Sequence, residues 1–129
     1  MRIQESAENY LETILVLSLR HPQVRSIDIA TEMSFSKPSV SVAMKNLRNS
    51  GHIAVDKDGH ITLTDSGRHI AETIYERHRL LSSWLIELGV DPQVAAEDAC
   101  RMEHVISPES FNAIKKHVEL RYGQLEKEP

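Results

Sequence analysis

Three residues near position 100 carry side chains of the kinds that bind transition metals. Cys100, Glu103 and His104 offer a thiolate, a carboxylate and an imidazole within one short segment. At about 100° per residue in a helix, these positions lie within about 100° of arc, so the three side chains face one direction. This mixture of soft and hard donors suits Fe(II), Zn(II) or Co(II) better than Mg(II) or Ca(II). The segment predicts a metal site, with the alternative that Glu103 and His104 are solvated and Cys100 is a small buried residue.

The same residues allow a second chemistry, that of a thiol enzyme. Cys100 and His104 are four positions apart, so the imidazole could lower the pKa of the thiol and activate it as a nucleophile. The sequence offers no oxyanion hole, no glycine-rich loop and no second cysteine to support such a reaction. We therefore expect a protein that is not an enzyme.

Three residues on other segments could extend a metal site. His78 is flanked by Arg77 and Arg79, an environment in which a histidine is usually exposed. Asn9 and Glu12 are three positions apart, which places them about 60° apart on the polar side of a helix, where they could chelate together. Considered alone, each of these residues indicates only a solvated surface.

The order of the expected elements in the first half is typical of a winged helix-turn-helix. Apolar residues at helical spacing predict helices over about 6–19, 26–33 and 37–50, the last with Pro38 in its first turn and Gly51 as its stop. Polar and apolar residues then alternate on both sides of the turn at 56–59, which predicts a β-hairpin.

The helical period returns after residue 64 and persists through most of the second half. A long helix is expected to Leu88, then two more over about 91–105 and 107–122. We therefore expect a mostly α fold with a small β-hairpin wing. It comprises a winged helix-turn-helix DNA-binding domain over residues 1–70 and a helical dimerisation and metal-binding domain over residues 71–129.

The third helix is the expected DNA-reading element. Val40, Met44 and Leu47 form an inward stripe, which leaves a surface that is small at its N-terminal end and basic further along. Such a surface suits the major groove, where short side chains reach base edges and cations meet phosphates. Ser36 and Pro38 are expected nearest the bases, while Lys57 and His60 on the wing are placed to meet the backbone. The complete predicted set is Arg25, Ser26, Ser36, Lys37, Pro38, Ser39, Ser41, Lys45, Arg48 and Lys57.

The composition limits the class of protein and its environment. The net charge is −4, yet residues 20–60 hold 6 Lys and Arg against 4 Asp and Glu, a local charge of +2 that allows DNA binding without requiring it. The acidic N-terminal segment lacks the basic start and apolar run of a signal peptide. No apolar stretch is long enough to span a membrane. With one cysteine, the chain is expected to be a soluble protein of the reducing cytoplasm.

Apolar residues in the second half exceed what a small monomer core would bury. This excess predicts a two-fold interface through that half, with the alternative that the residues only close the C-terminal core. The residues concerned are Leu80, Leu81, Trp84, Leu85, Leu88, Val94, Val105, Ile106, Phe111, Ile114 and Val118.

Several segments resemble the diphtheria-toxin repressor family of iron- and manganese-dependent bacterial repressors. The similarity covers most of the chain, from about Ser6 to Val118, and its most specific part is the A-C-R-M-E-H-V segment around Cys100. A-E-N-Y-L-E-T-I in the first helix, K-P-S-V-S in the third and R-H-R-L-L in the long helix add to it. The resemblance implies a homodimer that binds a palindromic DNA operator when Fe(II) or Mn(II) is bound between its two domains.

The resemblance also implies a ligand set: Asn9, Glu12, His78, Cys100, Glu103 and His104. Asn9 stands where iron-responsive members have Met and manganese-responsive members have Asp. Glu12 and His78 match the manganese type, whereas Cys100 matches the iron type, so the pattern is a hybrid. Ser82 and Ala96 replace the Glu and His of an ancillary iron-type site, which we therefore expect to be absent. Zn, Co or Ni can substitute in vitro because raw affinity follows the metal.

The function expected from this resemblance is that of a metal-dependent transcriptional regulator that represses genes of metal uptake. The chain ends at Pro129 without the SH3-like domain of longer members, so the short architecture is expected. The alternative function is a winged-helix transcription factor that senses a non-metal ligand or a partner protein.

Overall fold

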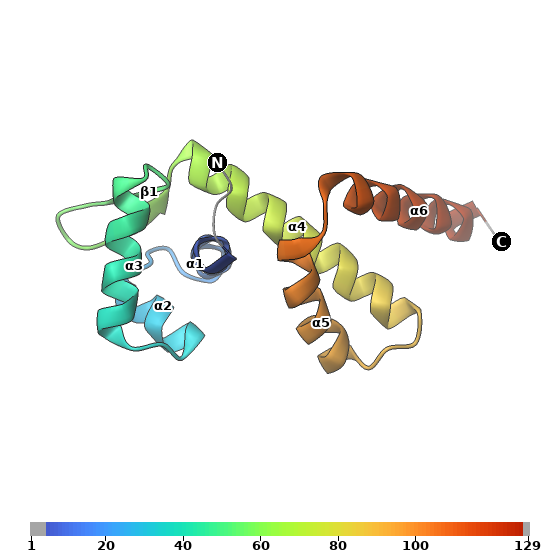
Figure 1. The fold of residues 1–129 in the computed structure, drawn as a ribbon, viewed down its shortest axis with the longest axis horizontal. Coiled ribbons are helices and arrows are strands. Elements are labelled where there is room, and N and C mark those ends of the chain that lie inside the picture. Colours follow the sequence, from blue (N-terminus) through green and yellow to red (C-terminus); the bar gives the residue numbers. More distant parts are fainter. Residues whose placement is uncertain (1–4, 128–129) are drawn as a thin grey trace. The chain divides into compact units, whose positions relative to one another are not determined.

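The computed structural model describes residues 5–127, with side chains described as far as Arg121. It confirms the expected mostly α fold with one hairpin (Figure 1). The chain forms two compact units that divide between Tyr75 and Glu76, inside a long helix. The elements are α1 (Glu5–Arg20), α2 (Ser26–Met33), α3 (Lys37–Asn49), β1 (Ile53–Val55), β2 (Ile61–Leu63), α4 (Asp65–Glu87), α5 (Pro92–Val105) and α6 (Pro108–Lys127).

The first unit is a winged helix-turn-helix built around an aliphatic core. Leu11, Ile29 and Val40 are fully buried, so α1, α2 and α3 each contribute one side to that core. The tight turn between α2 and α3 depends on Ser34, whose φ of 57° is left-handed. Ser36 then caps α3, its hydroxyl accepting a hydrogen bond from the Ser39 amide at 3.3 Å.

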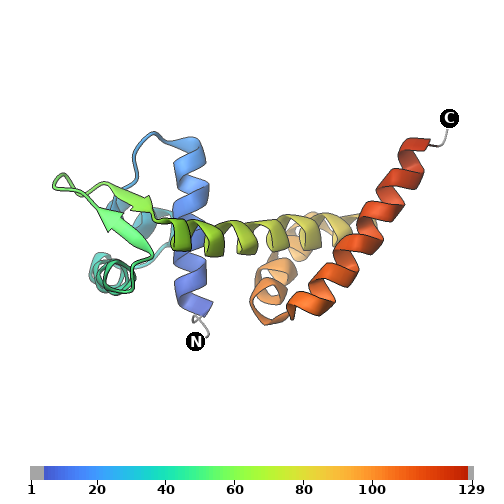
Figure 2. The same ribbon diagram turned by 90° about the horizontal axis from the view of Figure 1, so that it is seen from above.

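The wing is an antiparallel hairpin in which Ile53 is paired with Leu63 and Val55 with Ile61. Figure 2 shows its turn projecting away from the helices of the first unit. The Ile61 amide donates to the Val24 carbonyl at 2.7 Å, so β2 is also tied to the segment that precedes α2. The base of the hairpin packs closely on α4, since a Cβ added at Gly67 would overlap the His52 carbonyl. These contacts hold the wing at a defined place beside the helix-turn-helix formed by α2 and α3.

The second unit contains the C-terminal half of α4 together with α5 and α6. Its core is smaller, with Leu81, Ala99 and Phe111 buried at the centre. Asp91 caps α5 by accepting from the amides of Gln93 and Val94, and Pro92 begins the helix without needing a hydrogen bond. The helix α6 runs to Lys127, beyond the end expected near Tyr122, because a single glycine weakens a helix without terminating it.

Across residues 5–127, no helix combines the length and the apolar character needed to cross a bilayer.

Candidate functional site

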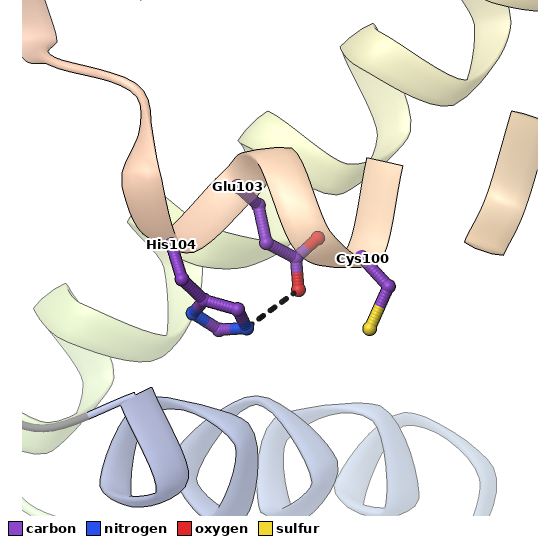
Figure 3. A group of neighbouring side chains, drawn as sticks. All are labelled: Cys100, Glu103 and His104. Carbon is purple, nitrogen blue, oxygen red and sulfur yellow. Dashed lines mark ion pairs between the residues drawn. The ribbon is translucent and has the colours of Figure 1, made fainter. Parts of the chain in front are cut away.

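The predicted metal-binding segment lies in the last turns of α5. Cys100, Glu103 and His104 project to the same side of the helix (Figure 3), and each offers a ligand atom within 4.8 Å of the others. Cys100 is exposed, and the side chain of His104 is 1% exposed. The helical spacing of these residues therefore does bring a thiol, a carboxylate and an imidazole together.

Glu103 is the centre of this group and is completely buried. Its Oε2 lies 2.9 Å from Nδ1 of His78 on α4. Its Oε1 lies 3.3 Å from Nε2 of His104, but the two are not aligned for a hydrogen bond, and no described residue supplies another partner. A buried carboxylate oxygen without a hydrogen bond is costly unless a cation compensates it. The orphaned oxygen, with a thiol and two imidazoles around its carboxylate, fits a divalent transition metal.

Arg77 supports the turn of α5 that carries the predicted metal ligands. Its Nη1 donates to the carbonyl oxygens of Glu103 at 3.1 Å and Ile106 at 3.0 Å. These carbonyls belong to the end of α5, where intrahelical donors are missing. The guanidinium carbon also lies 5.5 Å from the ring centroid of Phe111. Sequence reasoning missed Arg77, because residues 26 positions apart carry no spacing signal.

Asn9 and Glu12, the other predicted ligands, lie on α1 in the first unit. They are three positions apart and half-buried. Their participation in the site remains a prediction.

The outward face of α3 has the expected polar and basic character. Val40, Met44 and Leu47 are buried. The predicted DNA-contacting residues of this segment are all exposed, namely Ser36, Lys37, Pro38, Ser39, Ser41, Lys45 and Arg48. At the start of α2, Ser26 is half-buried and, with Ile27, Lys37 and Ser41, lines an open hollow of about 270 Å³ between α2 and α3.

Two features of this surface go beyond the predicted contacts. Val42, on α3, is 60% exposed and places an apolar side chain beside Ser41 and Lys45. The signal was present in the sequence, since Val42 falls outside the buried stripe. The other feature is Arg25, which was predicted to meet DNA but whose Nη2 also lies 3.1 Å from Nε2 of His60 on the hairpin. Lys57 is exposed in the turn of the wing, as a backbone contact requires.

Two family models match almost the whole chain in succession. Residues 2–61 match the iron dependent repressor N-terminal DNA binding domain. Residues 64–121 match the iron dependent repressor metal binding and dimerisation domain. The resemblance seen in the sequence is thereby confirmed. This is a family of DNA-binding transcriptional regulators, not of enzymes.

Individual relatives agree with the family models. The chain is 33% identical over 110 residues to the transcriptional regulator MntR of Salmonella typhimurium, covering 85% of this chain and 70% of the relative. It is 31% identical over 106 residues to the diphtheria toxin repressor of Corynebacterium diphtheriae, covering 81% of this chain and 47% of the relative.

A solved structure shares the fold. The structure of the manganese regulator SloR superimposes with a TM-score of 0.78 at 31% identity, covering 88% of this chain and 53% of that one. This chain therefore spans about half the length of that protein. Together with the two family models, these similarities show that the chain belongs to the iron-dependent repressor family.

Proposed function

We propose that the protein is a transcriptional repressor of metal-uptake genes that binds its operator when Fe(II) or Mn(II) occupies the α5 site. The observation that carries this proposal is the buried Glu103 carboxylate, whose Oε1 lacks a hydrogen bond among the described residues while Cys100 and His104 lie beside it. We further propose that the protein acts in the cytoplasm as a homodimer and that its operator is a palindromic duplex.

His78, Cys100, Glu103 and His104 would hold the metal in the second unit. The ion would supply positive charge to a buried carboxylate and a common anchor for donors on separate helices. Asn9 and Glu12 are proposed to add ligands from α1. An ion bound by both units would then restrain the winged helix-turn-helix relative to the unit through which the chains dimerise. Metal binding would then select the orientation in which two α3 helices reach successive major grooves.

The choice between iron and manganese depends on the donor set. Cys100 provides a soft sulfur donor that suits Fe(II), while carboxylates such as Glu103 also suit Mn(II). The exposure of Cys100 makes its thiol accessible to a metal arriving from solution.

The outward face of α3 is the proposed reading surface. Its exposed serines and Pro38 are short enough to allow close approach to base edges, and Lys45 and Arg48 would neutralise phosphates further along. Arg25 and Lys57 would extend the phosphate contacts to the start of α2 and to the wing.

The experiment that tests this function begins with a random duplex library. The reduced protein selects DNA under anaerobic conditions with Mn(II), with Fe(II) and with a chelator present. We expect one palindromic sequence to be enriched with either metal and none with the chelator. Equal enrichment with the chelator would contradict metal dependence and would favour a regulator that responds to a different ligand.

A further inference from the structure

A chain of three polar side chains connects the wing to the start of α2. Arg25 directly precedes α2, and its Nη2 lies 3.1 Å from Nε2 of His60. On the other side of the ring, Nδ1 of His60 lies 3.2 Å from Oδ2 of Asp56. Arg25 and His60 are 35 positions apart, so this contact exists only in the folded unit.

The chemistry of the three groups fixes the direction of both hydrogen bonds. A guanidinium only donates, so Nε2 of His60 must accept from Arg25. The hydrogen of the neutral ring is then on Nδ1, which donates to the Asp56 carboxylate. A protonated ring would present an N–H to Arg25 and could not keep this bond. The arrangement therefore requires a neutral imidazole in one defined tautomer.

Hydrogen bonds within the hairpin hold the Asp56 end of these three side chains rigidly. Oδ1 of Asp56 accepts from the amides of Asp58 and His60, both at 2.9 Å. The His60 side chain is only 17% exposed. Next to it, the backbone bond from Ile61 to Val24 ties β2 to the residue before Arg25. The ring consequently has little freedom to move away from Arg25.

The charges around His60 explain why a neutral imidazole between Arg25 and Asp56 matters. The carboxylates of Asp56 and Asp58 both approach His60, and Arg68 of α4 lines a surface hollow together with Asp56 and His60. Direct pairing of Arg25 with Asp56 would neutralise the guanidinium. With the imidazole between them, Arg25 is oriented through one donor and keeps its positive charge and its other donors, which suit a phosphate.

We propose that His60 is a positioning residue for DNA binding, which holds the Arg25 guanidinium at the junction of the wing and α2 for a phosphate contact. This inference rests on the proposed function. A metal on Asp56, Asp58 and His60 is a poorer explanation of the cluster, because both ring nitrogens already lie within hydrogen-bond distance of Arg25 and Asp56.

The test is a double-mutant cycle on Arg25 and His60, measured as affinity for the selected duplex over a range of salt concentrations. His60→Leu and Arg25→Gln should each weaken binding several-fold and reduce the salt slope by about one unit, the loss of one phosphate contact. The double variant should be no weaker than either single variant. His60→Gln, whose side-chain oxygen can accept from Arg25, should bind nearly as the unmodified protein does, and Asp58→Asn serves as the control in the same turn.

Additive losses in the double variant, or a His60→Gln variant as weak as His60→Leu, would overturn the positioning role. A second measurement uses the protein without DNA. In ¹⁵N spectra at pH 7.5, the His60 ring should be in the Nδ1–H tautomer. The Nε2–H tautomer would overturn the chain of hydrogen bonds itself. A protein with the expected tautomer that selects no duplex would instead contradict the proposed function, and with it the DNA role of His60.

Discussion

The imidazole of His78 and the carboxylate of Glu103 lie 2.9 Å apart although 25 positions of sequence separate them. This contact brings α4 and α5 together at the buried end of the predicted metal-binding segment. It gives Glu103 one hydrogen-bonded oxygen, whereas the other oxygen has no hydrogen bond among the described residues. The predictions below follow from that arrangement and from the α3 surface.

Glu103→Gln should abolish metal-dependent DNA binding. The neutral amide removes the charge of this fully buried side chain, so the metal-free protein should be as stable as the unmodified one or more stable. The rise in denaturation temperature that metal causes should disappear. Differential scanning calorimetry without and with Mn(II) measures the stability of the metal-free protein and the rise in denaturation temperature. Glu97→Gln, an exposed position on the same helix, should behave as the unmodified protein does; an equal loss in that variant would show that the effect is not specific to the site.

Cys100→Asp should preserve metal-dependent DNA binding and shift metal preference toward Mn(II). The substitution exchanges a soft sulfur donor for a hard oxygen donor of similar reach. Competition between Mn(II) and Cd(II), followed by DNA binding of the variant and of the unmodified protein, gives the ratio of affinities. Asn9→Asp should move the ratio in the same direction. An unchanged ratio in the Cys100 variant would mean that the thiol is not a ligand.

Arg77→Ala should weaken metal binding without touching a proposed ligand side chain. The substitution removes the donor shared by the Glu103 and Ile106 carbonyls, so the last turn of α5 loses its support. We expect a loss of about tenfold to 100-fold in metal affinity, the range typical of groups that orient ligands. Arg101→Ala, an exposed arginine on α5, is the matched control. Retained metal affinity in the Arg77 variant would show that the last turn of α5 keeps its conformation without the Arg77 hydrogen bonds.

Lys45 and Val42 should have different effects on DNA binding. Lys45→Ala should weaken binding to all duplexes about equally and reduce the salt slope by about one unit, because a phosphate contact carries no sequence information. Val42→Ala should leave the salt slope unchanged and relax preference at one position, since an exposed apolar side chain can contact a thymine methyl group. Repeating the library selection with both variants distinguishes them. Identical behaviour would mean that the α3 face is assigned wrongly.

The wing should weaken in acid because of Asp56. The hydrogen bond from the His60 backbone, together with weaker ones from the Asp58 backbone and the His60 ring, outweighs desolvation and holds the pKa of the Asp56 carboxyl below its usual 3.8. A lowered folded-state pKa means that this stabilisation is complete above about pH 4 and is lost as the pH falls through the folded value. The amide signals of Asp58 and His60 should shift in that interval. In Asp56→Asn, those shifts should be absent; if they persist, another group is titrating.

The sequence predicted those features that depend on spacing within one element. The buried stripe of α3 and the common face of Cys100, Glu103 and His104 follow directly from the helical repeat. Pro38 and Gly51 marked the limits of α3 through the known preferences of proline for the first turn of a helix and of glycine for the position after its end. Such local rules were sufficient for the winged helix-turn-helix and for three of the proposed ligands.

Contacts between distant segments could not be predicted in the same way. Arg77 reaches the end of α5, and Arg25 reaches His60, only after packing has brought the segments together. Neither pair is related by a helical or strand repeat. His78 was identified through family resemblance, since its flanking arginines indicated only an exposed surface. The burial of Glu103 was likewise unexpected, because a charged residue near a helix end is normally solvated.

The central claim is that metal at the α5 site controls DNA binding, and one titration tests it most directly. Fluorescence anisotropy of the selected duplex is recorded while Mn(II), and separately Fe(II), is added to the reduced protein without oxygen. The account predicts negligible binding with a chelator, saturable binding as metal is added, and no response in Glu103→Gln. Equal affinity with and without metal, together with calorimetry that detects no metal binding tighter than about millimolar (about −4 kcal/mol), would contradict it.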